Sequence, residues 1–180
     1  MIYCFLANGF EEMEAIVPVD MLRRCEKDVQ FVGVGDQIIS SAHQVNICVD
    51  ILAPEIVLDE TLEMIILPGG SLGTLNLEKN VYVQKAIDYC VENNKPIGAI
   101  CAAPSILGHK NLLDGKNATC YPGFDTQLFG ANYTGKLVEI DGNFIKAKGP
   151  GASLEFGLAL CQRLLGKERV DLLVPSLQCS

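Results

Sequence analysis

Cys101 is the residue whose position in the sequence best suits nucleophilic chemistry. It follows the short apolar run Ile97–Ile100, and Ala102–Leu107 then reads as the first turns of a helix. Ala99 and Ala103 lie two positions to either side and are small enough for the strained turn of a nucleophile elbow. Because the N-terminal end of a helix favours a thiolate, we expect a reactive cysteine with a lowered pKa. The alternative is a buried cysteine that serves as a small hydrophobic residue.

A second chemical feature is the pair Gly69-Gly70, which follows the continuous apolar run Met64–Leu67. Such a run is typical of a central parallel strand that is covered on both faces. Backbone N–H groups of the glycines can approach a bound oxygen closely, and with the N–H of Ala102 they would form an oxyanion hole beside Cys101. The alternative is a turn that needs glycine only for its positive φ.

A cysteine nucleophile usually has a histidine base, and this chain has two histidines, His43 and His109. His109 follows Cys101 on the same predicted helix, roughly 12 Å along its axis, so its ring cannot reach the sulfur. His43 lies in a predicted edge-strand region and could contribute only from a distant loop or a neighbouring subunit. A triad of the cysteine-protease or amidotransferase kind is therefore disfavoured.

Carboxylates could serve as the base instead, and Glu11, Glu12 and Glu14 begin the first predicted helix. On a helical wheel Glu14 borders the apolar face, whereas Glu11 and Glu12 point further away. We therefore expect Glu14 to be a half-buried acid with a raised pKa, and the other two to be acids that the helix dipole favours. Asp20 also falls on the apolar stripe, so the wheel leaves it as an alternative. The apolar face consists of Phe10, Met13, Val17 and Met21.

Strands and helices are predicted to alternate, which indicates a doubly wound parallel α/β sheet. Ligands of such folds bind at the carboxyl ends of the strands, where Gly69-Gly70 and Cys101 both fall. Residues 37–50 are expected to form a side hairpin or an edge strand. The predicted strands are Met1–Leu6, Asp28–Val34, Met64–Leu67, Ile97–Ile100, Lys116–Tyr121 and a hairpin over Val138–Lys146; the predicted helices are Glu11–Cys25, a short one within Pro54–Glu60, Val81–Asn93, Ala102–Leu107 and Leu154–Leu165.

The composition indicates a domain with a full hydrophobic core. With 180 residues, of which 49% are hydrophobic, the chain is expected to form one domain over residues 1–180. The net charge of −8 and the lack of a Lys/Arg cluster argue against nucleic acid or an anionic membrane as a partner. Because no apolar run approaches the ~18 residues of a membrane span and no signal-peptide pattern is present, we expect a cytoplasmic location.

The eight cysteines indicate neither a disulfide framework nor a metal site. Most of them lie in apolar strand-like or helix-like segments, and the cytoplasm keeps thiols reduced. They form no CxxC pair, and their spacings match no set of zinc ligands. We expect most of them to fill the core, and we predict neither a metal nor a cofactor.

Four motifs in order make the chain similar to the ThiJ/PfpI family, and the resemblance covers nearly its whole length. The chain resembles the branch of the parkinsonism-associated deglycase and its bacterial relatives, rather than the protease-like branch, in its length and in Asn76-Leu77, which follow the glycine loop. The motifs are Gly9–Asp20, Leu67–Gly73, Ala99–Pro104 and Lys148–Ser153.

This resemblance implies a flavodoxin-like sandwich and a homodimer. It assigns the family's reactive cysteine to Cys101, the acid beside its sulfur to Glu14, and the oxyanion amides to Gly70 and Ala102. The sequence also departs from the family pattern: Ala103 stands where glycine is common, Tyr121 where many members have a histidine, and His43 where relatives have an arginine that reaches across the dimer. Because a phenol is a poor base at neutral pH, Tyr121 argues against peptidase activity. Tyr121 and His43 are retained as possible accessory residues.

The function implied is a cysteine-dependent enzyme of the glyoxalase III or deglycase kind that acts on small dicarbonyls such as methylglyoxal, or on their protein adducts. Cys101 would attack the aldehyde, Gly70 and Ala102 would hold the oxyanion, and Glu14 would transfer the proton. The main alternative is an oxidative-stress sensor or chaperone in which an oxidant converts Cys101 to a sulfinate. A PfpI-type cysteine peptidase is a third, less favoured interpretation.

Overall fold

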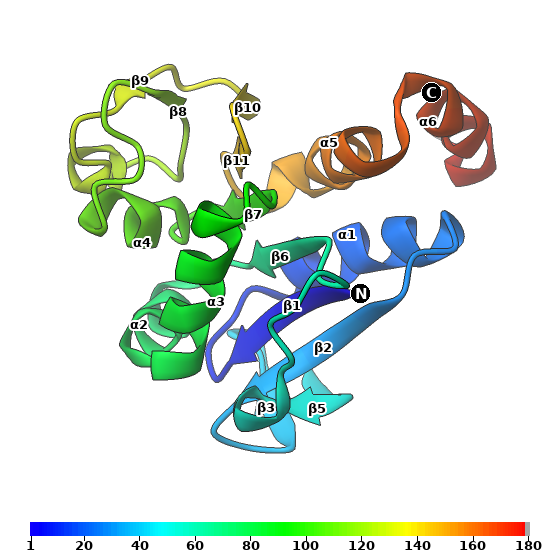
Figure 1. Cartoon of the computed structure of the whole chain (residues 1–180), viewed down its shortest axis with the longest axis horizontal. Helices are drawn as coiled ribbons and strands as arrows, with labels where there is room; N and C mark the ends of the chain where they lie inside the picture. The colour runs from blue at the N-terminus through cyan, green and yellow to red at the C-terminus, as the bar shows by residue number, and fades with distance from the viewer. Residues whose placement is uncertain (179–180) are drawn as a thin grey trace.

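The computed structural model describes residues 1–178, and its centre is a seven-stranded sheet in the order β10-β11-β7-β6-β1-β2-β5 (Figure 1). All neighbouring strands are parallel except β10 and β11, which form the hairpin predicted around Asp141-Gly142. Two short two-stranded sheets, β3-β4 and β8-β9, lie outside it. The strands are β1 (Ile2–Ala7), β2 (Val29–Val34), β3 (Ile38–Ser40), β4 (Asn46–Cys48), β5 (Ile51–Leu52), β6 (Met64–Leu67), β7 (Ile97–Ile100), β8 (Asn117–Ala118), β9 (Asn132–Tyr133), β10 (Val138–Asp141) and β11 (Phe144–Ala147).

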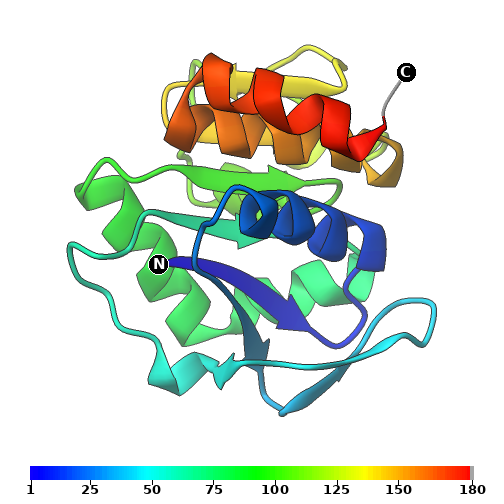
Figure 2. The same ribbon diagram turned by 90° about the vertical axis from the view of Figure 1, so that its right-hand side faces the viewer.

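Helices cover both faces of the sheet (Figure 2). Side chains of β1 alternate between the two cores: Cys4 and Leu6 pack with α1 and α5, whereas Tyr3 and Phe5 pack with α3. This two-sided burial is the reason for continuous apolar runs in the central strands. The helices are α1 (Glu12–Arg24), α2 (Ser71–Lys79), α3 (Val81–Glu92), α4 (Pro104–His109), α5 (Ser153–Leu165) and α6 (Lys167–Leu173), with 3-10 turns at Ala53–Glu55, Asp125–Gln127, Pro150–Ala152 and Val174–Leu177.

The predicted doubly wound, flavodoxin-like fold is confirmed, but three segments differ from the prediction. Residues 71–79 form a helix, α2, that the sequence did not reveal because its buried face consists of Gly73, Thr74 and Leu77, a weak apolar pattern. The strand predicted over Lys116–Tyr121 is only the two residues of β8, paired with β9 outside the main sheet. A further helix, α6, follows the predicted cap at Gly166.

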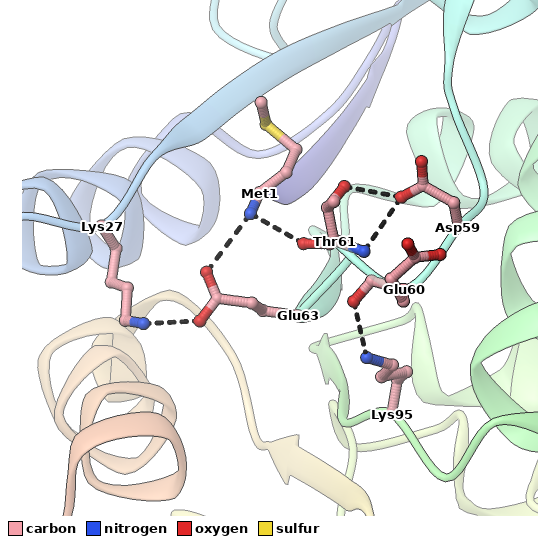
Figure 3. Close-up of polar contacts among 7 residues, drawn as sticks. All are labelled: Met1, Lys27, Asp59, Glu60, Thr61, Glu63 and Lys95. Carbon is pink, nitrogen blue, oxygen red and sulfur yellow. Dashed lines mark hydrogen bonds and ion pairs between the residues drawn. The ribbon is translucent and has the colours of Figure 1, made fainter.

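Polar contacts join the segments that precede β1, β2, β6 and β7, at the end of the sheet opposite the predicted site (Figure 3). The amino group of Met1 donates to Glu63 Oε1 at 3.2 Å, and Lys27 Nζ lies 2.5 Å from Glu63 Oε2. Lys95 Nζ donates to the carbonyl of Glu60 at 3.1 Å. These contacts hold the starts of the four strands relative to one another.

The β3-β4 hairpin holds the loop that joins β1 to α1. The N–H of Ser40 donates to Asn8 Oδ1 at 2.9 Å, and the N–H of Gly9 donates to the carbonyl of Ser40 at 2.8 Å. The N–H of Ala42 donates to the carbonyl of Phe10 at 2.7 Å. These three hydrogen bonds fix the loop through which the chain enters α1.

The seven described cysteines are free, and six of them are buried, as expected for residues that fill the core. Cys48 is exposed, and Cys179 lies outside the described residues. Within residues 1–178, no helix has both the length and the apolar character that crossing a membrane requires.

Candidate active site

Cys101 lies at the turn between β7 and α4 with the strained backbone of a nucleophile elbow. Its φ is 64°, a left-handed conformation that residues other than glycine rarely adopt. Its N–H donates to the carbonyl of Ala147 at 2.9 Å, and its carbonyl accepts from the N–H of Tyr121 at 2.8 Å. These two hydrogen bonds hold the strained residue in place, and its side chain is nearly buried, with 8% exposure for the residue.

Glu14 is fully buried at 0% exposure and belongs to the inward face of α1. That face consists of residues spaced by a helical turn, Glu14, Pro18 and Met21 with their neighbours, so Glu14 lies within the buried stripe rather than at its border. The helical wheel was wrong about Met13, which is 49% exposed, and Asp20 is exposed and paired with Arg24.

Glu11 and Gly69 position this buried acid. Glu11 caps α1, because its Oε2 accepts the N–H of Glu14 at 2.9 Å. The N–H of Gly69 donates to Glu14 Oε2 at 2.8 Å. Among residues 1–178, the other oxygen, Oε1, has no well-aligned hydrogen-bond partner. One oxygen of the carboxyl group is thus fixed, and the other is available to hold a transferred proton.

Glycine is required at positions 69 and 70 because neighbouring atoms leave no room for a side chain, and not only because the chain turns there. A Cβ at Gly69 would lie 2.6 Å from both Cys101 Cβ and Glu14 Oε2, so a side chain there would separate the thiol from the acid. Gly70 has φ 85°, and a Cβ there would lie 2.2 Å from the carbonyl oxygen of Gly9. Both glycines therefore allow the β6 end to pack directly against the cysteine and the β1–α1 loop.

The pKa of Glu14 shifts in the predicted direction, whereas the pKa of Cys101 shifts in the opposite direction to the one predicted. Burial raises the pKa of Glu14 to about 7, and interactions with the Cys101 thiol and the Gly69 N–H only partly oppose this. Burial, followed by the charge and hydrogen bond of Glu14, raises the pKa of Cys101 to about 12. The predicted lowering of the thiol pKa was wrong, because burial and the adjacent acid outweigh the backbone donors. The resting pair at neutral pH is a thiol beside a carboxyl group that gains and loses its proton near pH 7.

Backbone N–H groups also converge on the sulfur. Hydrogen bonds from the N–H groups of Gly70 and Ala102 lower the pKa of Cys101, although less than burial raises it. They are two of the three donors expected to form the oxyanion hole, and they come from the ends of two adjacent strands, β6 and β7. The third, Gly69, donates its N–H to Glu14 instead. The arrangement can stabilise negative charge on the sulfur, or on an oxygen bonded next to it.

Neither histidine pairs with Cys101. His43 Nδ1 lies 3.0 Å from Glu12 Oε1, and the ring is 71% exposed. His109 Nδ1 lies 2.6 Å from Glu78 Oε1. The two imidazoles are therefore occupied by glutamates, which agrees with the argument against a cysteine-histidine triad.

Glu11, Glu12 and His43 form a cluster whose ligand atoms lie within 4.8 Å of one another. Contacts within the protein already explain why these three side chains lie close together, because Glu11 caps α1 and Glu12 pairs with the exposed His43.

Tyr121, whose N–H donates to the carbonyl of Cys101, also lines a cavity that the sequence did not reveal. The cavity has a volume of about 380 Å³ and mainly apolar walls. Its only sequence signal is the Gly149-Pro150-Gly151 loop, whose first residue packs on Tyr121: a Cβ at Gly149 would lie 3.1 Å from Tyr121 Cδ2. The walls are Tyr121, Pro122, Leu137 and residues 148–152.

Comparisons with known proteins agree with this fold. Protein dj-1beta of Drosophila melanogaster is 35% identical over 92% of this chain and 90% of its own length. The glutathione-independent glyoxalase DJR-1.2 of Caenorhabditis elegans is 30% identical over 93% of this chain and 89% of its own length. Protein DJ-1 homolog B of Arabidopsis thaliana is 34% identical over 91% of this chain, which spans only 38% of that relative.

Structural comparison gives the same result. The crystal structure of a mutant DJ-1 superfamily protein from Salmonella typhimurium superposes with a TM-score of 0.93 at 31% identity, covering 99% of this chain and 98% of that one. A model of the DJ-1/PfpI family matches residues 1–163. The chain is therefore a member of the DJ-1/PfpI family.

Proposed function

We propose that the protein is a cysteine-dependent enzyme of the glyoxalase III or deglycase kind, acting on small dicarbonyls such as methylglyoxal or on their protein adducts. The observation that carries this proposal is the buried pair of Cys101 and Glu14, with the N–H groups of Gly70 and Ala102 directed at the sulfur. The glyoxalase name of a nematode relative of similar length supports the same reaction class.

In the first step the thiol adds to the aldehyde carbon of the dicarbonyl. Because the pKa of Glu14 is about 7, its carboxylate is well matched to accept the thiol proton as the S–C bond forms. The N–H groups of Gly70 and Ala102 stabilise the negative charge that develops on the aldehyde oxygen. Return of the proton to that oxygen gives a hemithioacetal.

In the second step Glu14 removes the aldehyde hydrogen as a proton and delivers it to the neighbouring ketone oxygen, which gives an enediol. Glu14 then takes the proton from the hydroxyl on the sulfur-bearing carbon and returns it to the neighbouring carbon, which produces a thioester of lactate on Cys101. Water then breaks the S–C bond, releases lactate and restores the thiol, so that the net reaction is methylglyoxal plus water to lactate and a proton. Each transfer uses the same carboxyl group, whose free Oε1 can take up and return the proton.

The test is lactate formation from methylglyoxal in buffer free of amines and thiols, since both react with dicarbonyls unaided. Wild type is compared with Cys101→Ala and Glu14→Gln at equal concentration. We expect multiple turnovers in wild type and none above background in either variant. Equal lactate formation in wild type and Cys101→Ala would contradict the enzyme, and equal turnover in Glu14→Gln would contradict the role of the acid.

A redox sensor is the second candidate, favoured by the same donors. Gly70 and Ala102 N–H groups, with a protonated Glu14, could hold the oxygens of a Cys101 sulfinate. Sensing needs only a fixed hydrogen bond, whereas turnover needs repeated proton transfer. We therefore expect Glu14→Gln to retain some peroxide reactivity while losing turnover, and a sensor without enzyme activity would show oxidation of Cys101 but no lactate.

For the functional form we propose a cytoplasmic homodimer. In support, α1 exposes the apolar side chains Met13 and Ile16, which a second copy could cover. Sedimentation equilibrium tests this part, with twice the mass of one chain expected, and a single-chain mass at micromolar concentration would contradict it.

A further inference from the structure

Two buried cysteines outside the candidate active site, Cys25 and Cys161, meet between α1 and α5. Cys25 caps the C-terminal end of α1 and is 5% exposed, whereas Cys161 lies within α5 and is fully buried. The two thiols are close enough for Cys25 to raise the pKa of Cys161, and both are free. Residues far apart in the sequence thus bring two thiols close together.

Close packing of the two helices explains this contact. α5 carries Gly157 where it crosses α1, and a Cβ there would lie 2.2 Å from Met21 Sδ and 3.2 Å from Pro18 Cα. A helix advances one turn in about four residues. Four residues beyond Met21 and four beyond Gly157 lie Cys25 and Cys161, so the close approach of the helices continues to the thiols.

The other cysteines provide a contrast. Cys90 and Cys120 belong to the core on the opposite face of the sheet from Cys25 and Cys161, and Cys4 shares their core but lies on β1 rather than on either helix. Cys101 interacts with Glu14 at the carboxyl edge. A cross-link between Cys25 and Cys161 would therefore form without involving the proposed active site.

We propose that Cys25 and Cys161 form an intramolecular disulfide when the protein meets hydrogen peroxide, as a second redox site independent of Cys101. Cys25, at the helix end, meets the oxidant first: its sulfur attacks a peroxide oxygen, the O–O bond breaks, and a sulfenic acid and one water form. The Cys161 thiol then attacks that sulfur, the S–S bond forms, the S–O bond breaks and a second water leaves. The two thiols lose two electrons and two protons, and hydrogen peroxide is reduced to two waters.

The setting of the pair makes this reaction slow. Burial, with the charge and hydrogen bond of Cys25, raises the pKa of Cys161 to about 12, so its thiolate is scarce at neutral pH. The disulfide should therefore accumulate under sustained rather than brief exposure to peroxide. Once formed, it would close a long loop of the chain and restrain the unfolded state.

Peptide mapping of the full chain tests the proposal. The protein is treated with hydrogen peroxide, alkylated and digested without reduction, and sampled over hours. We expect a cross-linked peptide pair containing Cys25 and Cys161, lighter by two hydrogens than the two reduced peptides together. Both cysteines recovered only as alkylated thiols or as sulfinic and sulfonic acids, with no cross-linked pair, would overturn the proposal.

Matched variants separate this site from the active site. Cys161→Ala should abolish the cross-linked peptide, whereas Cys90→Ala, at an equally buried cysteine, and Cys101→Ser should keep it. In the Cys101→Ser background, oxidation should raise the urea midpoint, and a reductant should reverse the rise. An unchanged midpoint with the disulfide present would contradict the restraint of the unfolded chain. A cross-link that disappears with Cys101→Ser would contradict the independence of the two sites. Neither the cross-linking result nor the stability result bears on lactate formation.

Discussion

Replacement of the buried acid by its neutral isostere, Glu14→Gln, should remove a pH dependence from the stability of the protein. Burial raises the pKa of Glu14 from 4.5 to about 7. At about 1.4 kcal/mol for each pH unit, this shift corresponds to about 3 kcal/mol. The folded state favours the protonated acid, so the contribution is fully present below pH 4.5 and is lost as the pH rises through about 7.

Urea denaturation between about pH 5 and about pH 8 measures this effect. The free energy of unfolding of Glu14→Gln, relative to wild type, should increase by about 2 to 3 kcal/mol over that range. Asp20→Asn is the matched control on the same helix, because Asp20 is exposed and paired with Arg24; its difference from wild type should stay within about 0.5 kcal/mol. A Glu14→Gln curve parallel to wild type would refute the argument that Glu14 titrates near neutral pH.

Three further results are expected. Gly69→Ala would place a Cβ 2.6 Å from both Cys101 Cβ and Glu14 Oε2. It should lower the free energy of unfolding, measured in urea, by about 1–3 kcal/mol and lower kcat/KM at least about 100-fold. Gly151→Ala is the control and should change both little, because a Cβ there meets open space. In wild type, kcat/KM for methylglyoxal should fall about tenfold for each pH unit below about 7, as protonation removes the Glu14 carboxylate; a flat profile between pH 5 and 8 would contradict it. Burial lowers the pKa of Lys146 from 10.5 to about 8, so wild type should gain stability as the pH rises above about 8, and Lys146→Met should lack that gain; parallel stability curves for the two proteins would count against it.

The sequence predicted the central framework because the signals there are local. Met64–Leu67 and Ile97–Ile100 are continuous apolar runs, and both became central strands with the predicted bounds. α2 was missed because its contacts with the core use glycine, threonine and a single leucine, which leave no apolar period to detect. The side chains that bury α2 belong to other elements, so no local pattern could predict it.

For the candidate site, residue types and strand ends predicted which groups would meet, but not their protonation. The raised pKa of Glu14 was expected from its place on the helix, and the structure agrees, although the acid is fully rather than half-buried. The pKa of Cys101 was predicted in the wrong direction, because the helix end was visible in the sequence and the surrounding core was not. The cavity beside Tyr121 was also missed, since its walls come from three separate segments between strands and helices.

The β3-β4 hairpin has a consequence for transplanting this site into other scaffolds. Its backbone hydrogen bonds with Asn8, Gly9 and Phe10 hold the entry to α1, and Glu14 lies one turn further on. A minimal scaffold that keeps the strands, the elbow and α1 but trims the hairpin would remove these hydrogen bonds from the loop that leads into the helix carrying the acid. Loop shortening in residues 38–48 should therefore be treated as an active-site mutation, although the sheet itself does not need those residues.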